Sequence, residues 1–191
     1  RYAHRDFSLA PIAALMARQF AERPGNYLAF FSSYAYLQSV LDEFRAAHPQ
    51  IPVWVQSRQM DEGERQAFLD RFCSNGRGIG FAVLGGAFGE GIDLPGARLI
   101  GAFIATLGLA QLKPVNEQMK RRMAAIFGAG YDYTYLYPGV QKVVQAAGRV
   151  IRTQQDQGVV MLIDDRFGEG KVRQLLPRWW SIEPTLFHSA Q

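Results

Sequence analysis

Cysteine is nearly absent from this 191-residue chain, which carries Cys73 as its single thiol. One thiol excludes a disulfide framework and any metal or iron–sulfur site built from four cysteines within this sequence. We expect Cys73 to be a half-buried side chain on a helix, because lone cysteines usually pack as small hydrophobic groups. This cysteine usage is typical of the reducing cytoplasm, which is the compartment that we expect.

Three other features are missing. The three histidines, His4, His48 and His188, are too scattered for a zinc site, so we expect no metal ligands in the chain. No apolar run approaches the about 18 to 20 residues needed to cross a bilayer, so we expect no membrane partner. Nor is there a G-x-x-x-x-G-K-S/T sequence, since Gly170-Lys171 continues with Val172. The chain therefore has no phosphate cradle of the P-loop type.

The composition is that of a globular protein with a substantial core. Hydrophobic residues make up 48% of the chain and charged residues 20%, which excludes a disordered tail and a fibrous repeat. The formal charge of +4 is compatible with a polyanionic partner without requiring one. Because the chain opens at Arg1 without an initiator methionine, we expect an excised piece of a longer protein or a processed product, whose function is shared with residues outside this sequence.

Apolar strands and amphipathic helices alternate along the chain. The predicted strands are residues 27–32, 53–56, 80–85, 98–104 and 158–164. The predicted helices lie near 12–20, from Ser33 toward Pro49, from Asp61 to Phe72, over 112–126 and over about 139–152. Strands that are apolar throughout and separated by helices indicate a parallel sheet covered on both faces. We predict one α/β domain over residues 1–191, with three layers and a mostly parallel central sheet.

A glycine-rich segment, Gly85 to Gly96, follows the third predicted strand and has five glycines in twelve positions. In parallel sheets ligands bind beyond the carboxyl ends of the strands. Glycines there let the backbone approach a ligand and direct amides at an anion. Asp93 could accept hydrogen bonds from ribose hydroxyls or order a basic neighbour. A tight turn that needs positive φ angles explains the same glycines.

A second cluster, Gln145-x-x-Gly148-Arg149-x-x-Arg152, lies in the last predicted helix. Helical periodicity places these residues on one side, opposite an apolar stripe. Two guanidiniums one turn apart suit bidentate contact with a phosphate chain. A glycine within a helix costs about 1 kcal/mol, which favours a functional reason for Gly148 over a merely solvated polar face.

Together these segments resemble a known family. Gly86-x-x-x-Glu90-Gly91-Ile92-Asp93 and the glutamine–glycine–arginine cluster are similar to motifs V and VI of superfamily-two helicases of the DinG/XPD type. Phe30-Phe31-Ser32-Ser33-Tyr34 is similar to motif IV of that branch. The resemblance covers about residues 25–180 and is to the second, C-terminal motor domain. It implies a RecA-like fold.

The resemblance also implies a shared ATP site. In such helicases ATP and Mg²⁺ bind between two lobes, and the first lobe supplies the P-loop, the acid that holds Mg²⁺ and four iron–sulfur cysteines. Arg152 would be the arginine finger on the γ-phosphate, supported by Arg149 and Gln145. The remaining residues implied near ATP are Gly148, Glu90, Gly91 and Asp93.

The resemblance further implies contacts to single-stranded DNA. Ser32 and Ser33 would meet the DNA backbone through hydroxyl and amide groups. Gln56, Gly86 and Phe88 complete the expected nucleic-acid contacts. The implied function is the second motor lobe of an ATP-dependent DNA helicase of DNA-repair type. Its partners would be single-stranded DNA and an N-terminal motor lobe of the same polypeptide, and the isolated chain should be inactive.

Alternatives remain open. One is a non-enzymatic nucleic-acid- or nucleotide-binding module of RecA-like shape, and another is an α/β enzyme that clamps a phosphorylated metabolite with the arginine pair. Tyr131, Tyr133, Tyr135 and Tyr137 alternate, and we expect an extended segment packed on one face, with base stacking as the alternative. The basic run 120–122 on an amphipathic helix is expected to be a solvated face, with phosphate contact as the alternative.

Overall fold

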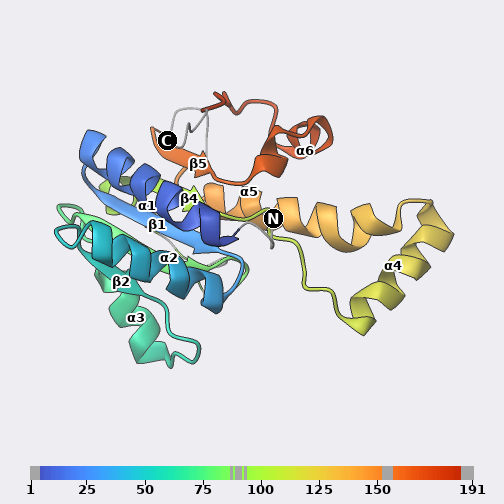
Figure 1. The fold of residues 1–191 in the computed structure, drawn as a ribbon, viewed down its shortest axis with the longest axis horizontal. Coiled ribbons are helices and arrows are strands. Elements are labelled where there is room, and N and C mark those ends of the chain that lie inside the picture. The colour runs from blue at the N-terminus through green and yellow to red at the C-terminus, as the bar shows by residue number, and fades with distance from the viewer. Residues whose placement is uncertain (1–4, 87, 89–91, 93, 152–156, 186–191) are drawn as a thin grey trace.

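A twisted parallel sheet forms the centre of the molecule (Figure 1). The computed structural model describes residues 5–86, 88, 92, 94–151 and 157–185. Within them, the sheet has the order β2-β3-β1-β4-β5, and every neighbouring pair is parallel. The strands are β1 (Asn26–Phe31), β2 (Val53–Val55), β3 (Gly78–Val83), β4 (Gly101–Ile104) and β5 (Val159–Leu162). The predicted α/β class with a parallel sheet is therefore confirmed.

Helices connect the strands and flank the sheet. They are α1 (Arg5–Glu22), α2 (Tyr34–Ala47), α3 (Glu62–Asp70), α4 (Pro114–Phe127), α5 (Tyr137–Ala147) and α6 (Gly170–Leu175). Two 3₁₀ turns, η2 (Gly96–Arg98) and η4 (Asp165–Gly168), and one π-helical segment, η3 (Asp132–Leu136), complete the described elements. No described helix combines the length and the apolar character that a membrane span requires.

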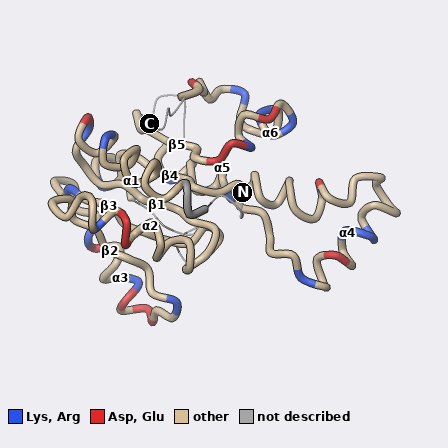
Figure 2. Tube along the Cα trace, in the orientation of Figure 1, with Lys and Arg blue, Asp and Glu red and all other residues tan. Residues whose placement is uncertain are grey.

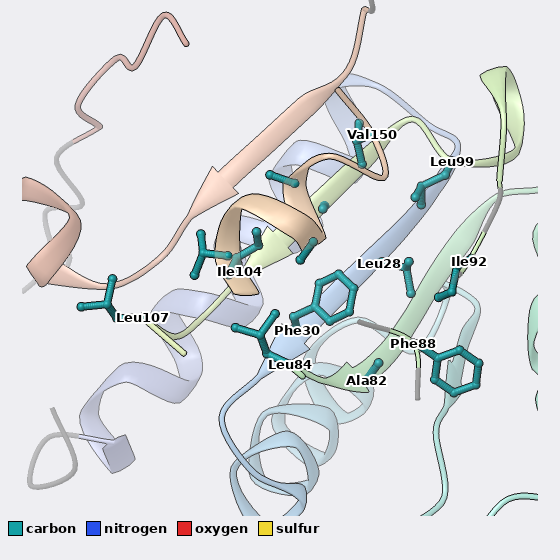
Figure 3. Packing of buried hydrophobic residues seen from close by; sticks show 14 of the residues in the cluster. Leu28, Phe30, Ala82, Leu84, Phe88, Ile92, Leu99, Ile104, Leu107 and Val150 are labelled. Atoms are coloured by element: carbon teal, nitrogen blue, oxygen red, sulfur yellow. The ribbon is translucent and has the colours of Figure 1, made fainter. Parts of the chain in front are cut away.

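Two hydrophobic clusters lie on opposite faces of the sheet. Tyr27, Ala29 and Phe31 of β1 pack with residues of α1 and α2. Leu28 and Phe30 of the same strand face the other way and pack with residues of α3 and α5. Figure 3 shows part of this second cluster, including Leu28 and Phe30. Because successive side chains of a strand point to opposite faces and both faces are covered, β1 is buried at every position and is apolar from Tyr27 to Phe31.

Local capping signals set the starts of two helices. Ser33 is the N-cap of α2 and accepts a hydrogen bond from the Tyr36 amide at 3.2 Å. Asp61 and Glu64 form a reciprocal capping box at the start of α3, with distances of 2.8 and 2.9 Å. Such side chains satisfy amides that the first helical turn leaves without partners. Both predicted helix starts are confirmed.

Two local predictions were wrong. Cys73 is exposed and lies in the turn after α3, not half-buried on a helix. The alternating tyrosines do not form an extended segment, because residues 132–136 are π-helical and lead directly into α5. Alternation of aromatic residues resembles a strand pattern, and here it arises in a helical segment whose larger turn shifts which side chains share a face.

The segment α4–η3, continued by the start of α5, forms a helical arm that extends away from the sheet (Figure 1), while the rest of α5 packs on the sheet. Within the arm, the phenol of Tyr135 donates a hydrogen bond to Glu117 Oε1 at 2.7 Å. Lys120 Nζ donates to Glu117 Oε2 at 2.8 Å. The hydrogen bonds from Lys120 and Tyr135 lower the pKa of the Glu117 carboxyl. Burial raises the pKa of the Tyr135 phenol to about 12, and its bond to Glu117 adds to this shift. These contacts connect α4 to η3.

The raised pKa of Tyr135 predicts a loss of stability in alkaline solution. An ordinary tyrosine loses its proton near its reference value of 10.0, so above that pH the unfolded chain binds fewer protons than the folded chain. The contribution of Tyr135 is thus complete below pH 10 and is lost as the pH rises toward 12. Urea unfolding of the wild type and of Tyr135→Phe should show a stability difference that shrinks over this range. Tyr131→Phe, at a half-exposed ring, is the control, and an unchanging difference for Tyr135→Phe would contradict the assignment.

Candidate functional site

The carboxyl ends of the parallel strands bring several predicted site residues to one edge of the sheet. Ser32 and Ser33 follow β1, Gln56 follows β2, and Gly86 lies three residues beyond β3. The parallel register pairs β1 with β3 and β2 with β3. Loops from distant parts of the sequence therefore meet at this edge, which is where such sheets bind ligands.

The two serines occupy the turn between β1 and α2. Both side chains are half-buried. The Ser33 hydroxyl accepts the Tyr36 amide, so part of its hydrogen-bonding capacity already stabilises the helix start. The serines lie where the sequence predicted, at the first turn of a helix whose N-terminal dipole favours an anion.

Gln56 is a buried residue that extends the pairing of β2 with β3. Its amide N–H donates to the Phe81 carbonyl at 2.8 Å. Its side-chain Oε1 accepts the Val83 amide at 2.9 Å. A Cβ atom on Gly86 would lie 3.4 Å from Gln56 Nε2, so the two residues are neighbours. The Gln56 side chain thus holds the start of the glycine-rich segment in place.

A cavity of about 800 Å³ opens beside these two residues. It is lined by Tyr34, Gln56, Ser57, Arg58, Gln59, Met60, Asp61, Glu64, Arg65 and Gly86. The Arg58 guanidinium lies 5.5 Å from the centre of the Tyr34 ring, a cation–π distance. The Tyr34 hydroxyl donates to the Ser57 carbonyl at 3.1 Å, which fixes the ring. Arg58 was not among the expected site residues, because an isolated arginine after a strand has no distinctive local pattern.

The described part of the glycine-rich segment is anchored in the core. Phe88, Ile92 and Leu94 are buried, and Figure 3 shows Phe88 and Ile92 beside Leu28 and Ala82. The Phe88 ring stacks on Phe68 with centres 4.3 Å apart. A fully buried ring packs as a core residue, which does not fit the nucleic-acid contact that we expected of Phe88. Glu90, Gly91 and Asp93 lie outside the described residues.

The turn at Gly85 needs a glycine and brings a lysine to this edge. Gly85 has a φ of 74°, a conformation that other residues adopt only with strain. A Cβ atom there would lie 3.1 Å from the side chain of Lys142 on α5. Lys142 is therefore a basic group above the glycine-rich turn. Helical periodicity alone did not single it out.

The glutamine–glycine–arginine cluster does not form one continuous helix. We predicted a helix to about residue 152, but α5 ends at Ala147 with Gly148 as its C-cap. Gly148 has a φ of −64° and lies at the end of α5, not inside it. The free-energy cost of a glycine within a helix therefore does not apply to this position. A Cβ atom there would lie 3.2 Å from the Val144 carbonyl oxygen, which makes the turn tight. Gln145 is exposed, and Arg152 lies outside the described residues.

Arg149 connects the two motifs directly. Its NH1 donates to the Ile92 carbonyl at 3.1 Å, between residues 57 positions apart in the sequence. Arg149 is half-buried and follows the buried Ala146 and Ala147. The turn that follows α5 therefore holds one side of the glycine-rich segment, and Gln56 holds the other.

At the end of β5, charge is neutralised within the chain. Arg166 donates to both oxygens of Asp164 at 2.7 and 2.6 Å. Burial by itself raises the pKa of the Asp164 carboxyl, but the hydrogen bonds from Arg166 outweigh it and lower that pKa. The Arg166 guanidinium is therefore already paired with the ionised carboxylate of Asp164. Within the described part of the chain, no group of three or more His, Cys, Asp or Glu side chains is arranged to hold a metal ion.

Comparison with known proteins identifies the same family as the motifs. The profile of the helicase C-terminal domain matches residues 16–183. The XPD helicase subunit of general transcription and DNA repair factor IIH from Schizosaccharomyces pombe is 27% identical over 82% of this chain and 21% of its own length. A protein of Methanocaldococcus jannaschii named probable ATP-dependent helicase is 30% identical over 76% of this chain and 24% of its own length. The chain thus spans about a quarter or less of these relatives.

Solved structures share the fold at low sequence identity. An apo structure of XPD has a TM-score of 0.69 at 19% identity and covers 86% of this chain and 33% of its own. The Xpd4 structure from S. tokodaii has a TM-score of 0.64 at 17% identity and covers 92% of this chain and 34% of its own. The second RecA-like domain of the DEAD-box helicase Mss116p, bound to an RNA duplex, has a TM-score of 0.52 at 13% identity, covering 83% of this chain and 50% of its own. The predicted RecA-like fold is confirmed.

The bond from Arg149 to Ile92 predicts that Arg149→Met loosens the glycine-rich segment. Loss of a hydrogen bond from a charged donor at a half-buried site should lower the free energy of unfolding by about 1–2 kcal/mol. Urea unfolding measures this loss, and limited proteolysis should cleave faster within residues 85–96. Arg178→Met, at an exposed arginine, is the matched control. Equal cleavage rates in the two variants would mean that Arg149 does not support the segment.

Proposed function

The chain belongs to the helicase C-terminal domain family, and from that membership we propose that it is the second motor lobe of an ATP-dependent DNA helicase. In this role it supplies an arginine finger to the ATP site and contacts to single-stranded DNA. The observation that carries the proposal is the hydrogen bond from Arg149 to the Ile92 carbonyl. This bond joins the glutamine–glycine–arginine cluster, which we propose to sense the nucleotide, to the glycine-rich segment, which follows the carboxyl end of β3.

The ATP side of the proposal centres on Arg152. Arg152 follows Arg149 by three positions and is the proposed finger on the γ-phosphate. A guanidinium at that point stabilises charge that develops in the transition state, which is worth roughly 10³–10⁵ in rate in other phosphoryl-transfer systems. Gln145 is exposed at the end of α5 and is proposed to meet the nucleotide there, beside Gly148. Glu90, Gly91 and Asp93 are proposed to lie near the nucleotide.

The donor set of this chain fits half of an ATP site. It offers guanidinium and amide donors at Arg149 and Gln145 but, within the described residues, no acidic cluster for Mg²⁺. We therefore assign the P-loop and the Mg²⁺ ligands to an N-terminal motor lobe of the same polypeptide. ATP bound between the lobes would supply the free energy of its hydrolysis. The residues of this chain hold the nucleotide from one side and keep Arg149 oriented through Ile92.

The DNA side of the proposal uses the cavity at the carboxyl edge. Ser32 and Ser33 directly precede α2, whose first residue, Tyr34, lines the cavity together with Gln56 and Gly86. Arg58, held over the Tyr34 ring, adds a cation suited to a phosphate or a base. The side-chain oxygen of Gln56 already accepts a hydrogen bond from the Val83 amide, so the proposed role of Gln56 is to shape the cavity. Phe88 is left out of the contacts because it is buried.

Replacing the proposed finger tests the ATP side. In the longer protein, Arg152→Ala should abolish ATP turnover, because the transition-state charge loses its partner, and should leave single-strand binding in place. Steady-state ATPase assays and fluorescence anisotropy with an oligothymidine measure the two properties. Arg173→Ala, on an exposed face of α6, is the control. Loss of DNA binding with normal turnover would mean that Arg152 serves the other side, and ATPase activity of the 191-residue chain alone would contradict a shared site.

Replacing Arg58 tests the DNA side. Arg58→Ala in the longer protein should weaken single-strand binding several-fold and lower the slope of log affinity against log salt by about 1, the value for one lost phosphate contact. Basal ATP hydrolysis without DNA should be unchanged. Arg45→Ala is the control, because α2 runs back from the carboxyl edge and Arg45 lies in its last turn. If Arg58→Ala and Arg45→Ala bind DNA equally, the cavity is not part of the DNA path.

A further inference from the structure

The outer face of α4 is an apolar surface that the domain itself does not cover. In Figure 1, α4 stands apart from the sheet at the far end of the arm. Among the described elements it packs against η3. The sequence pattern is that of an amphipathic helix, and a surface helix normally turns its apolar stripe toward its own core. Whether that stripe faces the domain or solvent therefore indicates whether the arm is an interaction surface.

The inner face of α4 is the polar and small-residue face. Glu117 and Lys120 lie on it and form the hydrogen bonds that reach Tyr135. Gly130 lies so close to α4 that a Cβ atom there would collide with the Lys120 carbonyl and with Ala124. At about 100° per residue, Glu117, Lys120 and Ala124 share one side of the helix. This side is therefore the one fixed against the rest of the arm.

The apolar stripe points the opposite way. Val115, Met119 and Ile126 share the face opposite to Glu117 and are 64, 43 and 60% exposed. Leu112, just before the helix, is 82% exposed. Spacings of three and four residues are those that a second helix laid along the stripe would match. Exposed apolar side chains that gather on one face of a helix are typical of interaction sites.

Charge on the arm selects among the occupants. Residues 113–127 carry four basic side chains and one acidic one, and Figure 2 shows the basic groups along α4. The acidic one, Glu117, already binds Lys120 and Tyr135. Arg122 borders the apolar stripe and is exposed; Lys113 and Arg121 are also exposed, but helical periodicity places Arg121 nearer to Glu117 than to the stripe. A partner that buries the stripe must therefore place a carboxylate against Arg122, and the excess of basic groups on the arm favours an acidic partner.

We propose that the outer face of α4 docks an acidic amphipathic helix of another polypeptide. Its apolar residues cover Val115, Met119 and Ile126, and a carboxylate on its flank pairs with Arg122. A second copy of the arm would bring Arg122 against like charge. A nucleic-acid strand would meet aliphatic side chains instead of the flat rings on which bases stack. The nearby Phe127 ring instead stacks on Tyr133, with centres 4.7 Å apart.

The test measures the binding of designed peptides to the 191-residue chain, which has a hydrophobic cluster on each face of its sheet. The probe is a fluorescent helix of about three heptads with leucine at three- and four-residue spacing and glutamate on the flanks. A second peptide has lysine in place of each glutamate. At low salt the acidic peptide should bind at least tenfold more tightly than the basic one. Met119→Gln with Ile126→Gln should weaken binding at least tenfold, and Arg122→Glu should reverse the preference between peptides.

Matched controls give every alternative outcome a definite meaning. Leu175→Gln, at an exposed apolar residue of α6, should bind the acidic peptide like the wild type, and circular dichroism should confirm that all variants fold. Equal binding of the two peptides, or unchanged binding by the double variant, overturns the proposal. A wild-type dimer that the double variant dissolves, measured by light scattering, assigns the face to a second copy. An oligothymidine that displaces the peptide from wild type assigns it to nucleic acid.

Discussion

The parallel arrangement of all described strands is the constraint on which the rest of the structure depends. Each connection between parallel neighbours has to return along a face of the sheet, so both faces are covered and β1 is buried at every position. The same constraint brings the strand ends to one edge. Ser33, Gln56 and Gly86 come from separate parts of the sequence and meet there because the sheet has only one carboxyl edge.

Hydrogen bonds to backbone groups organise that edge. Gln56 accepts the Val83 amide on one side of the glycine-rich segment, and Arg149 donates to the Ile92 carbonyl on the other. Buried polar side chains of this kind are costly unless paired, and each pairing fixes a loop. The buried Phe88 and Ile92 add apolar anchors. The described part of the segment is therefore supported both from the core and from the turn that follows α5.

In the helical arm, hydrogen bonds and close packing fix the polar side of α4 toward the rest of the chain, and not its apolar side. A short approach at Gly130 and the bonds to Glu117 fix the polar side of α4 inward, so its apolar stripe faces solvent. Periodicity predicted the helix itself but contains no information on which face meets the domain. The π-helical turn over residues 132–136 was likewise beyond local pattern, because alternating tyrosines match a strand period when no tertiary contact is known.

Local chemistry in the sequence determined the five strands, the caps at Ser33 and Asp61, the parallel class of the sheet and the two motifs that identify the family. These depend on short-range rules of capping, burial and spacing, which a linear sequence contains in full. Tertiary structure decided that α5 ends at Ala147, that Arg149 reaches Ile92, that Phe88 is a core residue and that Arg58 lies over Tyr34. Each of these involves how a helix ends or which neighbours a folded chain brings within a few ångströms. Their free energies depend on atoms that only the fold brings together.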